Sequence, residues 1–285
     1  MRGCLPRNSD FRGIRDKDLK KSTVPRVYAR GFILLYNQVM DESRLTLEDL
    51  GRKGIKMYQL KDGFRFGTDT VLLAWFTASF IKSGKSNKAL ELGANCGAAT
   101  LLVSARKEEA NIDTLEIDRD AHEVLDMNIA LNDLDARIKA YQGDVRELPN
   151  EIKQKQYDIV FMNPPFFKET TGPSSAKVGR CELNGCLADF IKAGASRLIP
   201  SSGIMTVVMT ASRADEVMKL MSDNGIKPVR FMSVHPTPQK KAELVLIAGK
   251  KTNTDAQLEI MPPLILNDKD RMNKIYDEEH EDCFI

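Results

Sequence analysis

The 285-residue sequence has only three histidines and no cysteines at the CxxC spacing. Its five cysteines are scattered along the chain, so neither a zinc site nor a disulfide framework is indicated. The sequence also lacks an apolar run long enough to cross a bilayer, and its first residues lack the apolar segment of a secretory signal. We therefore expect a cytoplasmic protein without a metal site or a membrane anchor.

An excess of charge of one sign is also missing, because the net charge is +2. The two ends nevertheless differ. Residues 1–39 contain nine Lys or Arg and three acidic residues, whereas residues 268–285 contain three Lys or Arg and seven acidic residues. A polyanionic partner would therefore have to bind to a local patch. We expect residues 1–39 to be a poorly ordered basic extension, with an RNA-binding arm as the alternative.

Short apolar segments alternate with amphipathic segments between residues 87 and 251. This alternation predicts an α/β fold in which helices cover both faces of a mostly parallel, seven-stranded sheet. Strands are expected at 88–92, 112–117, 138–142, 157–162, 204–209, 228–235 and 242–248, and helices at 98–107, 119–131, 183–198 and 214–222. Few residues separate the last two strands, so we expect them to form an antiparallel hairpin at one edge. Residues 252–285 are assigned to a C-terminal tail.

Residues 40–86 are expected to pack on this domain as a hairpin followed by a helix. Residues 55–60 have the pattern of a strand and precede a turn that contains glycine. Asp69 is one of the residues that can cap a helix over 70–80, whose apolar side chains form one face. Phe64, Phe66 and Asp69 are candidates for lining a cofactor pocket, although packing and capping would explain them equally well.

The most informative stretch is the apolar segment 159–162 and the four residues that follow it, Asn163-Pro164-Pro165-Phe166. The apolar run is typical of a buried strand, and the two prolines end it because they cannot donate to a sheet ladder. A proline also biases the preceding residue towards an extended backbone. We therefore expect residues 163–166 to form a stiff lip at the carboxyl end of a strand, where open α/β sheets bind their ligands.

This lip, residues 163–166, offers two neighbouring hydrogen-bond acceptors. The side-chain oxygen of Asn163 and the carbonyl of Pro164 can accept both hydrogens of one planar NH2 group. Holding both hydrogens directs the nitrogen lone pair outward, and Phe166 supplies a flat face on which the attached ring could stack. The motif predicts a site that presents an exocyclic amine as a nucleophile. A plain strand followed by a Pro-Pro turn is the alternative.

Three further features fall at the ends of the preceding strands. Gly93 and Gly97 lie where the backbone turns after the first strand, but the segment lacks the G-x-G-x-x-G spacing of dinucleotide sites. Glu116 ends the second strand, where a carboxylate can bind two ribose hydroxyls. Asp144 follows the third strand, where it could bind the amine of an adenine. Taken alone, Glu91 could be a surface acid, Glu116 could form a salt bridge at the sheet edge and Asp144 could cap the turn after it. Together with the lip, the four features in chain order favour one ligand site.

Residues 88–166 resemble the S-adenosylmethionine-dependent class I methyltransferases, and the lip resembles the motif of those that methylate planar NH2 groups. Residues 45–251 are more narrowly similar to the bacterial tRNA adenine-N6 methyltransferases that modify the adenine beside the anticodon of a valine tRNA. The run from Asp62 to Ala74 and the closing hairpin from Val234 to Leu246 carry this narrower resemblance. It implies a Rossmann-like class I methyltransferase fold, S-adenosylmethionine as cofactor and tRNA as substrate.

The resemblance also implies roles for individual residues. Asn163 would hold the target amine, and Pro164, Pro165 and Phe166 would complete the catalytic motif. The residues expected to border the cofactor are Glu91, Gly93, Asn95, Gly97, Glu116, Asp144 and Asn163, with Phe66 and Asp69 as further candidates.

An adenine in RNA would have to be flipped outward to reach the lip, so cations are expected near its mouth. The candidates are Lys53, Lys56, Arg65, Lys168, Lys177, Arg180, Arg230, Lys240 and Lys241. A protein-glutamine N5 methyltransferase and a ribosomal RNA or DNA amino-methyltransferase are alternatives with the same chemistry. A noncatalytic RNA-binding module is the alternative from another class. The sequence is compatible with a monomer but does not determine the oligomeric state.

Overall fold

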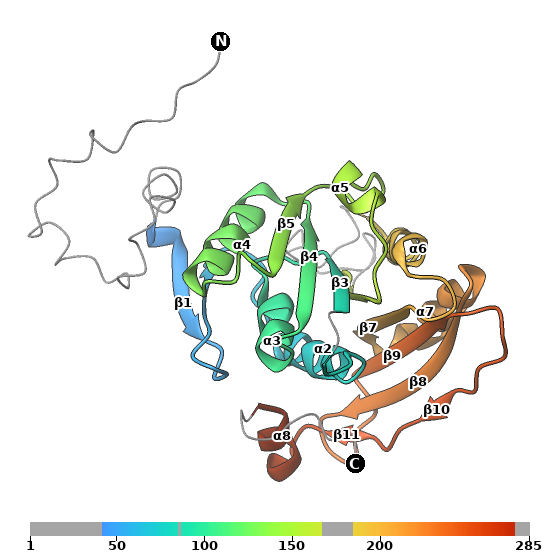
Figure 1. Ribbon diagram of the computed structural model, residues 1–285. Helices are drawn as coiled ribbons and strands as arrows, with labels where there is room; N and C mark the ends of the chain where they lie inside the picture. Colours follow the sequence, from blue (N-terminus) through green and yellow to red (C-terminus); the bar gives the residue numbers. More distant parts are fainter. Residues whose placement is uncertain (1–41, 85–86, 167–184, 277–285) are drawn as a thin grey trace, which may run out of the picture. The chain divides into compact units, whose positions relative to one another are not determined.

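The computed structural model describes residues 42–84, 87–166 and 185–276 (Figure 1). The chain divides into two units, Met1–Asp41 and Glu42–Ile285, and every described residue belongs to the second unit. The basic extension expected over residues 1–39 lies outside the described residues.

The centre of the described unit is a sheet whose strand order is β10-β8-β9-β7-β6-β3-β4-β5, with β11 also paired to β8. Its strands are β3 (Asn87–Leu92), β4 (Ala110–Glu116), β5 (Ile138–Gln142), β6 (Ile159–Met162), β7 (Ile204–Thr210), β8 (Ile226–His235), β9 (Leu244–Lys251), β10 (Glu259–Ile260) and β11 (Leu264–Ile265). Strands β5, β4, β3, β6 and β7 are parallel, and β9 runs antiparallel between β7 and β8. The expected mostly parallel α/β fold with a closing antiparallel hairpin is confirmed. The described part of the sheet has nine strands rather than seven, because β10 and β11 pair with the outer side of β8.

Strand β6 is buried because it lies between β3 and β7 and helices cover the sheet on both sides. Helix α6 (Leu187–Arg197) approaches this strand closely at Gly194. A Cβ atom on Gly194 would lie 2.7 Å from Met205 Cε and 3.0 Å from Val160 Cγ1, so a larger residue would require these side chains to shift. The lip follows β6 directly, and its starting point is therefore fixed by a tightly packed core.

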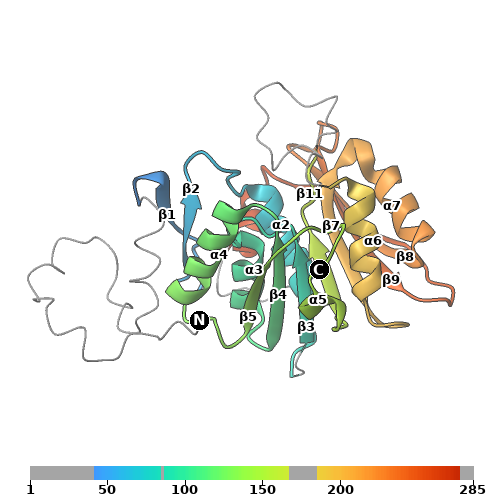
Figure 2. The same ribbon diagram turned by 90° about the horizontal axis from the view of Figure 1, so that it is seen from above.

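Helices cover both faces of the sheet (Figures 1 and 2). One face carries α2 (Thr68–Ala78), α3 (Ala98–Arg106) and α4 (Arg119–Leu131), and the other carries α5 (Asn150–Lys153), α6 and α7 (Ala214–Asp223). Helix α2 packs on α3 and β7, where the buried hydroxyls of Thr77 and Thr206 lie 2.7 Å apart. Helix α6 begins at Leu187, later than the sequence predicts, because Cys186 has an extended backbone and caps the helix together with Asp189.

A separate hairpin of β1 (Leu45–Asp49) and β2 (Lys56–Leu60) lies against α4. Two asparagines one turn apart, one within α4 and one at its C-cap, bind the backbone of β2. Asn128 accepts a hydrogen bond from the Tyr58 N–H at 2.6 Å and donates to the Tyr58 carbonyl at 2.9 Å. Asn132 makes the same pair of bonds to Lys56, at 3.0 and 2.7 Å. These side chains replace the hydrogen bonds of a neighbouring strand and hold the hairpin in place.

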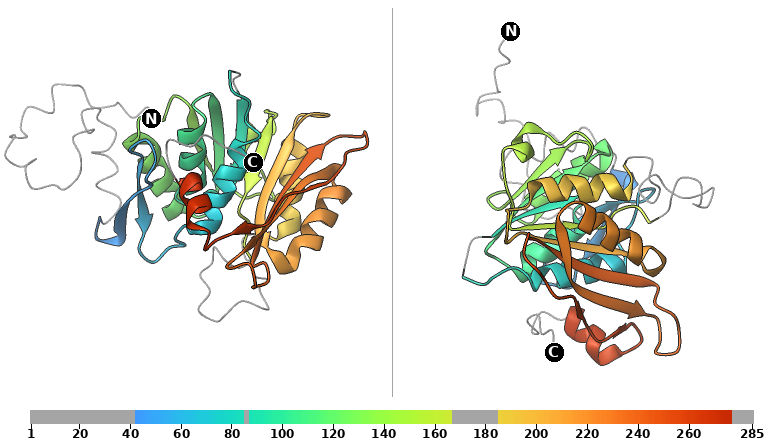
Figure 3. Two further views of the ribbon diagram at one scale, coloured as in Figure 1. Left: turned by 90° about the horizontal axis from the view of Figure 1, so that it is seen from below. Right: turned by 90° about the vertical axis from the view of Figure 1, so that its right-hand side faces the viewer.

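The segment after β9 is docked on the domain (Figure 3). Besides β10 and β11 it forms α8 (Lys269–Tyr276), which lies beside α2 and buries Met272 and Ile275. Arg106 at the end of α3 donates a hydrogen bond to the carbonyl of Ile275 at 2.6 Å. None of the helices in the described ranges combines the length and the apolar character that a membrane span requires.

Candidate active site

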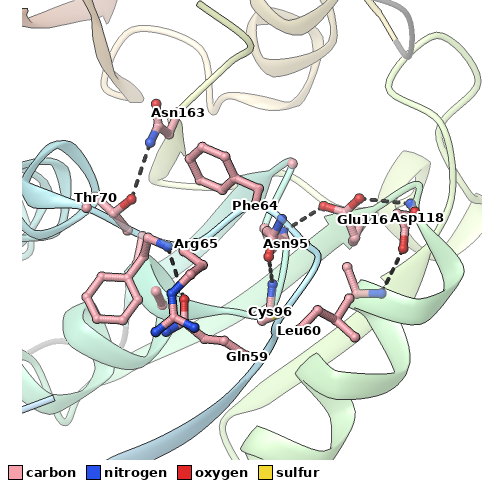
Figure 4. Close-up of a pocket in the computed structure, with 18 of the residues that line it drawn as sticks. Gln59, Leu60, Phe64, Arg65, Thr70, Asn95, Cys96, Glu116, Asp118 and Asn163 are labelled. Carbon is pink, nitrogen blue, oxygen red and sulfur yellow. Dashed lines mark hydrogen bonds between the residues drawn. The ribbon is translucent and has the colours of Figure 1, made fainter. Parts of the chain in front are cut away.

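A cavity of about 610 Å³ lies at the carboxyl ends of β3, β4 and β6 (Figure 4). This volume falls within the range of small-molecule pockets. The strand ends form one side, and β2, the β2–α2 connection and the start of α2 form the other. The predicted site residues that line it are Arg65, Phe66, Asp69, Glu91, Gly93, Asn95, Glu116, Asn163, Pro164, Pro165 and Phe166.

The loop after β3 turns sharply along the wall of the cavity. Gly93 has a φ of 73° and Asn95 a φ of 50°, a left-handed conformation that asparagine tolerates better than most residues. The backbone N–H of Asn95 donates to Glu116 at 2.6 Å, and its side-chain oxygen accepts from the Cys96 N–H at 2.6 Å. The carboxylate at the end of β4 thus holds the loop that follows β3.

Two buried carboxyl groups line this part of the cavity. Glu91 accepts hydrogen bonds from the backbone N–H and the hydroxyl of Thr100, yet burial raises the pKa of Glu91 to about 8. Burial also raises the pKa of Glu116, whose two oxygens accept from the N–H groups of Asn95 and Asp118. A carboxylate has about four lone-pair positions, so Glu116 can accept further hydrogen bonds from a ligand. Such perturbed acids in a cleft are typical of functional sites.

Two predicted cofactor residues are not among those that line the cavity. Asp144 follows β5, and its carboxylate pairs with Arg146 at 2.5 Å, which lowers the pKa of Asp144. Gly97 faces α4 instead. With a φ of 92°, it lies so close to Leu125 that a Cβ atom would clash with that side chain. Gly97 therefore allows close packing of the loop on α4, and Asp144 would have to leave Arg146 to reach a ligand.

The carboxamide of Asn163 is oriented by the start of α2 (Figure 4). Its nitrogen lies 3.2 Å from Asp69 Oδ2 and 3.3 Å from Thr70 Oγ1. A carboxylate oxygen can only accept hydrogen bonds, so the amide nitrogen must face α2. The amide oxygen of Asn163 therefore points away from α2 and is placed as an acceptor for a ligand.

Arg213 holds the backbone of the lip and was not predicted from the sequence. It lies just before α7 with only 9% of its surface exposed. Its guanidinium donates to the carbonyl oxygens of Pro165 and Phe166 at 3.4 and 3.3 Å and pairs with Glu216 at 2.9 Å. The lip is therefore held at two places. The start of α2 binds the Asn163 side chain, and Arg213, just before α7, binds two backbone carbonyls.

The predicted basic residues lie in different surroundings. Arg65 is exposed, lines the cavity and pairs with Glu48 of β1 at 2.5 Å. Arg230 pairs with Glu259 at 2.9 Å and lies 5.1 Å from the centre of the Phe80 ring. Its charge therefore helps to hold β10 on β8, away from the cavity.

Other cations of the predicted set are exposed. Lys53 pairs with Glu108 at 2.7 Å, and Lys56 belongs to β2. Lys240 and Lys241 lie in the connection that follows the carboxyl end of β8. Lys168, Lys177 and Arg180 lie outside the described residues.

The hairpin side of the cavity also contains residues that the sequence did not suggest. The buried Gln59 of β2 accepts a hydrogen bond from the Phe66 N–H at 3.1 Å and so fixes the chain before α2. Phe64, which the sequence did suggest, also lines this side. Asp118, after β4, and Phe190 of α6 line the cavity as well and were not suggested by the sequence. The sequence contained one signal for the position of this hairpin: Asn128 and Asn132 are spaced by one helical turn and are suited to binding an extended backbone.

This sheet order and a cavity at the strand ends define a Rossmann-like methyltransferase fold. A solved structure from Agrobacterium tumefaciens, described as a predicted O-methyltransferase, matches with a TM-score of 0.57 and 21% identity, over 72% of this chain and 97% of that chain. A second structure from the same organism, a SAM-dependent methyltransferase, matches with a TM-score of 0.52 and 14% identity, over 75% of this chain and 72% of that chain. These similarities establish the fold.

The chain belongs to the methyltransferase small domain family, whose model matches residues 65–223, more than half of the chain. It is 25% identical over 210 residues to a protein of Flavobacterium psychrophilum, covering 72% of this chain and 88% of that one. It is 28% identical over 198 residues to a protein of Bacteroides fragilis, covering 69% of this chain and 81% of that one. Both relatives are named tRNA1(Val) (adenine(37)-N6)-methyltransferase. The predicted enzyme class is confirmed: the protein is a methyltransferase, and S-adenosylmethionine is its cofactor.

The residues of the cavity fit this cofactor. Buried carboxyl groups can accept hydrogen bonds from its ribose hydroxyls, and Gly93 leaves space where a side chain would meet Phe190 at 3.0 Å. Among the described residues, no group of three or more His, Cys, Asp or Glu is arranged to hold a metal ion.

Proposed function

We propose that this protein transfers the methyl group of S-adenosylmethionine to the N6 amine of an adenine in tRNA, beside the anticodon of a valine tRNA. The observation that carries the proposal is the orientation of Asn163 on the cavity wall, next to the carbonyl of Pro164. Together these groups can accept both hydrogens of one NH2 group. The names of relatives that align over most of the chain support tRNA as the substrate and hence a cytoplasmic location.

The cofactor supplies an electrophilic methyl group on a positively charged sulfur. The main task of the protein is to place the target amine in line with this methyl group, and such orientation can contribute about 7 to 11 kcal/mol. Asn163 and the Pro164 carbonyl would hold the two amine hydrogens and so direct the nitrogen lone pair outward. When bound, S-adenosylmethionine would supply the methyl group and keep the electrons of its sulfur–carbon bond, and one amine proton would leave to water. A neutral amine needs no general base to begin this attack.

The cavity suggests which residues hold the parts of the cofactor. Glu116 would bind the ribose hydroxyls, and Glu91, Gly93 and Asn95 would border the methionine part. The binding of the cofactor adenine by Asp144 stays a prediction, because it requires separation from Arg146.

The tRNA would contact cations at the same edge of the domain. Arg65 on the cavity wall and the exposed Lys240 and Lys241 are the described residues that we propose for phosphate binding. Lys168 and Arg180 stay predictions, and the ion pair of Arg230 with Glu259 disfavours a role for Arg230.

Methylation of unmodified tRNA transcripts tests the proposal. With labelled cofactor, N6-methyladenosine should appear beside the anticodon of a valine tRNA, identified by mass after digestion. Asn163→Ala should lower the rate at saturating cofactor by about 10²-fold or more, because a hydrogen bond to the reacting group is lost, while the Kd of the cofactor stays nearly unchanged. Parallel reactions contain release factors, ribosomal RNA or DNA. Product in one of these alone would contradict a tRNA substrate.

A further inference from the structure

We propose that Asp69 and Thr70 are positioning residues that fix the rotation of the Asn163 carboxamide, rather than residues that bind the cofactor. The inference rests on the proposed function, because it concerns how the lip receives its target amine. Its starting point is the pair of contacts from Asn163 Nδ2, at 3.2 Å to Asp69 Oδ2 and 3.3 Å to Thr70 Oγ1.

The carboxylate of Asp69 permits one orientation of the amide, and the Thr70 hydroxyl, which donates to Asp69 Oδ1 at 3.4 Å, presents a lone pair to the same NH2 group. The NH2 group of Asn163 has two hydrogens, and Asp69 and Thr70 offer one acceptor oxygen for each of them. A rotation of the amide by half a turn would bring its oxygen against the carboxylate of Asp69. Two acceptors would then face each other without a proton between them, and a part-buried carboxylate oxygen would lose its partner. The pair therefore keeps Asn163 Oδ1 directed away from α2, as the target amine requires.

The two positioning residues are themselves held by rigid structure. Asp69 Oδ1 accepts a hydrogen bond from the Thr70 N–H at 2.8 Å, so its other oxygen is left for Asn163. Thr70 is 6% exposed, and α2 is anchored on β7 further along. The absence of a side chain at Gly67 leaves room for the Asp69 carboxylate, since a Cβ atom there would lie 3.0 Å from Asp69 Oδ1. A site held on packed elements keeps its geometry better than one on a loop.

The test compares variants that remove an acceptor with variants that keep one. Asp69→Ala and Thr70→Val remove an acceptor, whereas Asp69→Asn and Thr70→Ser retain one. We expect the first two to lower the single-turnover rate of methyl transfer about 10- to 100-fold, less than the loss of Asn163 itself. The conservative variants should recover most of the rate. The Kd of S-adenosylmethionine should change by less than about 3-fold in all four. Thr68→Val, the same substitution at an exposed position of α2, is the matched control and should keep the wild-type rate.

Two further measurements separate positioning from other roles. In the Asn163→Ala background, Asp69→Ala should cause little additional loss, because residues that act through one another are not additive. The side-chain NH2 signals of Asn163, assigned by their absence in Asn163→Ala, should show slow hydrogen exchange that is lost in Asp69→Ala and Thr70→Val.

The outcomes are distinct. A raised cofactor Kd with a normal rate at saturation would make Asp69 a cofactor ligand and overturn the proposal. Additive losses in the Asn163→Ala background, or unchanged exchange of the Asn163 amide, would also overturn it. If the wild-type protein transferred no methyl group to an amine, the proposed function would fail, but the exchange measurement would still decide whether Asp69 and Thr70 fix the amide.

Discussion

Glu91 and Glu116 line the same cavity, but their hydrogen-bond partners differ. Glu91 is bound by the first turn of α3 through Thr100, whereas Glu116 is bound by the backbone of the loop after β3. Burial is the main cause of the raised pKa in each case. For Glu91 the pKa of about 8 means that the folded protein holds this carboxyl group in its protonated form near neutral pH.

This raised pKa predicts a pH dependence of stability. The unfolded pKa is near 4.5, so the contribution of Glu91 to stability is fully present below that pH and is lost as the pH rises towards 8. Compared with Glu91→Gln, which stays neutral, the wild-type protein should therefore lose unfolding free energy between pH 4.5 and 8. The limiting slope is on the order of 1 kcal/mol per pH unit, because one proton is released. Urea denaturation of both proteins without cofactor at several pH values measures this difference. Parallel curves across this range would contradict the raised pKa.

The pairing of β2 with α4 is the main feature at the scale of elements. A hairpin of two five-residue strands is marginal alone, and here a helix supplies the hydrogen bonds that a third strand would provide. Asn128 is fully buried and also donates to the carbonyl of Cys96 at 2.8 Å, so it joins the hairpin to the loop after β3. The wall of the cavity formed by β2 therefore depends on α4.

Removal of the Asn128 amide should weaken both stability and cofactor binding. Asn128→Ala leaves the part-buried N–H of Tyr58 without its acceptor and the buried carbonyl of Cys96 without its donor, and we expect the unfolding free energy to fall by about 2 to 4 kcal/mol. Asn132→Ala removes similar hydrogen bonds at a more exposed position, and it should lower the unfolding free energy by less than half as much. Urea denaturation and calorimetric titration with S-adenosylmethionine measure the two effects. Equal losses for both variants would show that burial of Asn128 is not the cause.

At the scale of the whole molecule, the segment after β9 completes the described unit. It covers the outer edge of β8 with two parallel pairings and buries Leu264, Met272 and Ile275. An uncovered edge strand can pair with other chains, so this cover also protects β8. The division into residues 1–39, 40–86, 87–251 and 252–285 stays a prediction, but within it residues 259–276 carry elements that the sequence did not indicate.

A chain that ends at Lys251 should therefore be less stable and more prone to associate. Each buried aliphatic side chain contributes about 1.5 to 3 kcal/mol, so loss of three predicts a decrease of several kcal/mol. A chain that ends at Tyr276 keeps β10, β11 and α8 and is the matched control. Thermal unfolding and size-exclusion chromatography compare the two. An unchanged midpoint for the shorter chain would mean that these elements do not support the sheet.

The sequence by itself determined the kind and order of the main elements, the position of the lip at a strand end and the class of chemistry. These follow from short-range causes, namely apolar periodicity, the missing N–H of proline and the residue types beside each strand end. The tertiary structure decided which partners those residues have. Asp69 and Asn163 are 94 residues apart, and Arg213 and Phe166 are 47 apart. Such partners become neighbours only when the sheet is assembled, and the same packing decides which acids are buried and which, like Asp144, pair with a neighbouring cation.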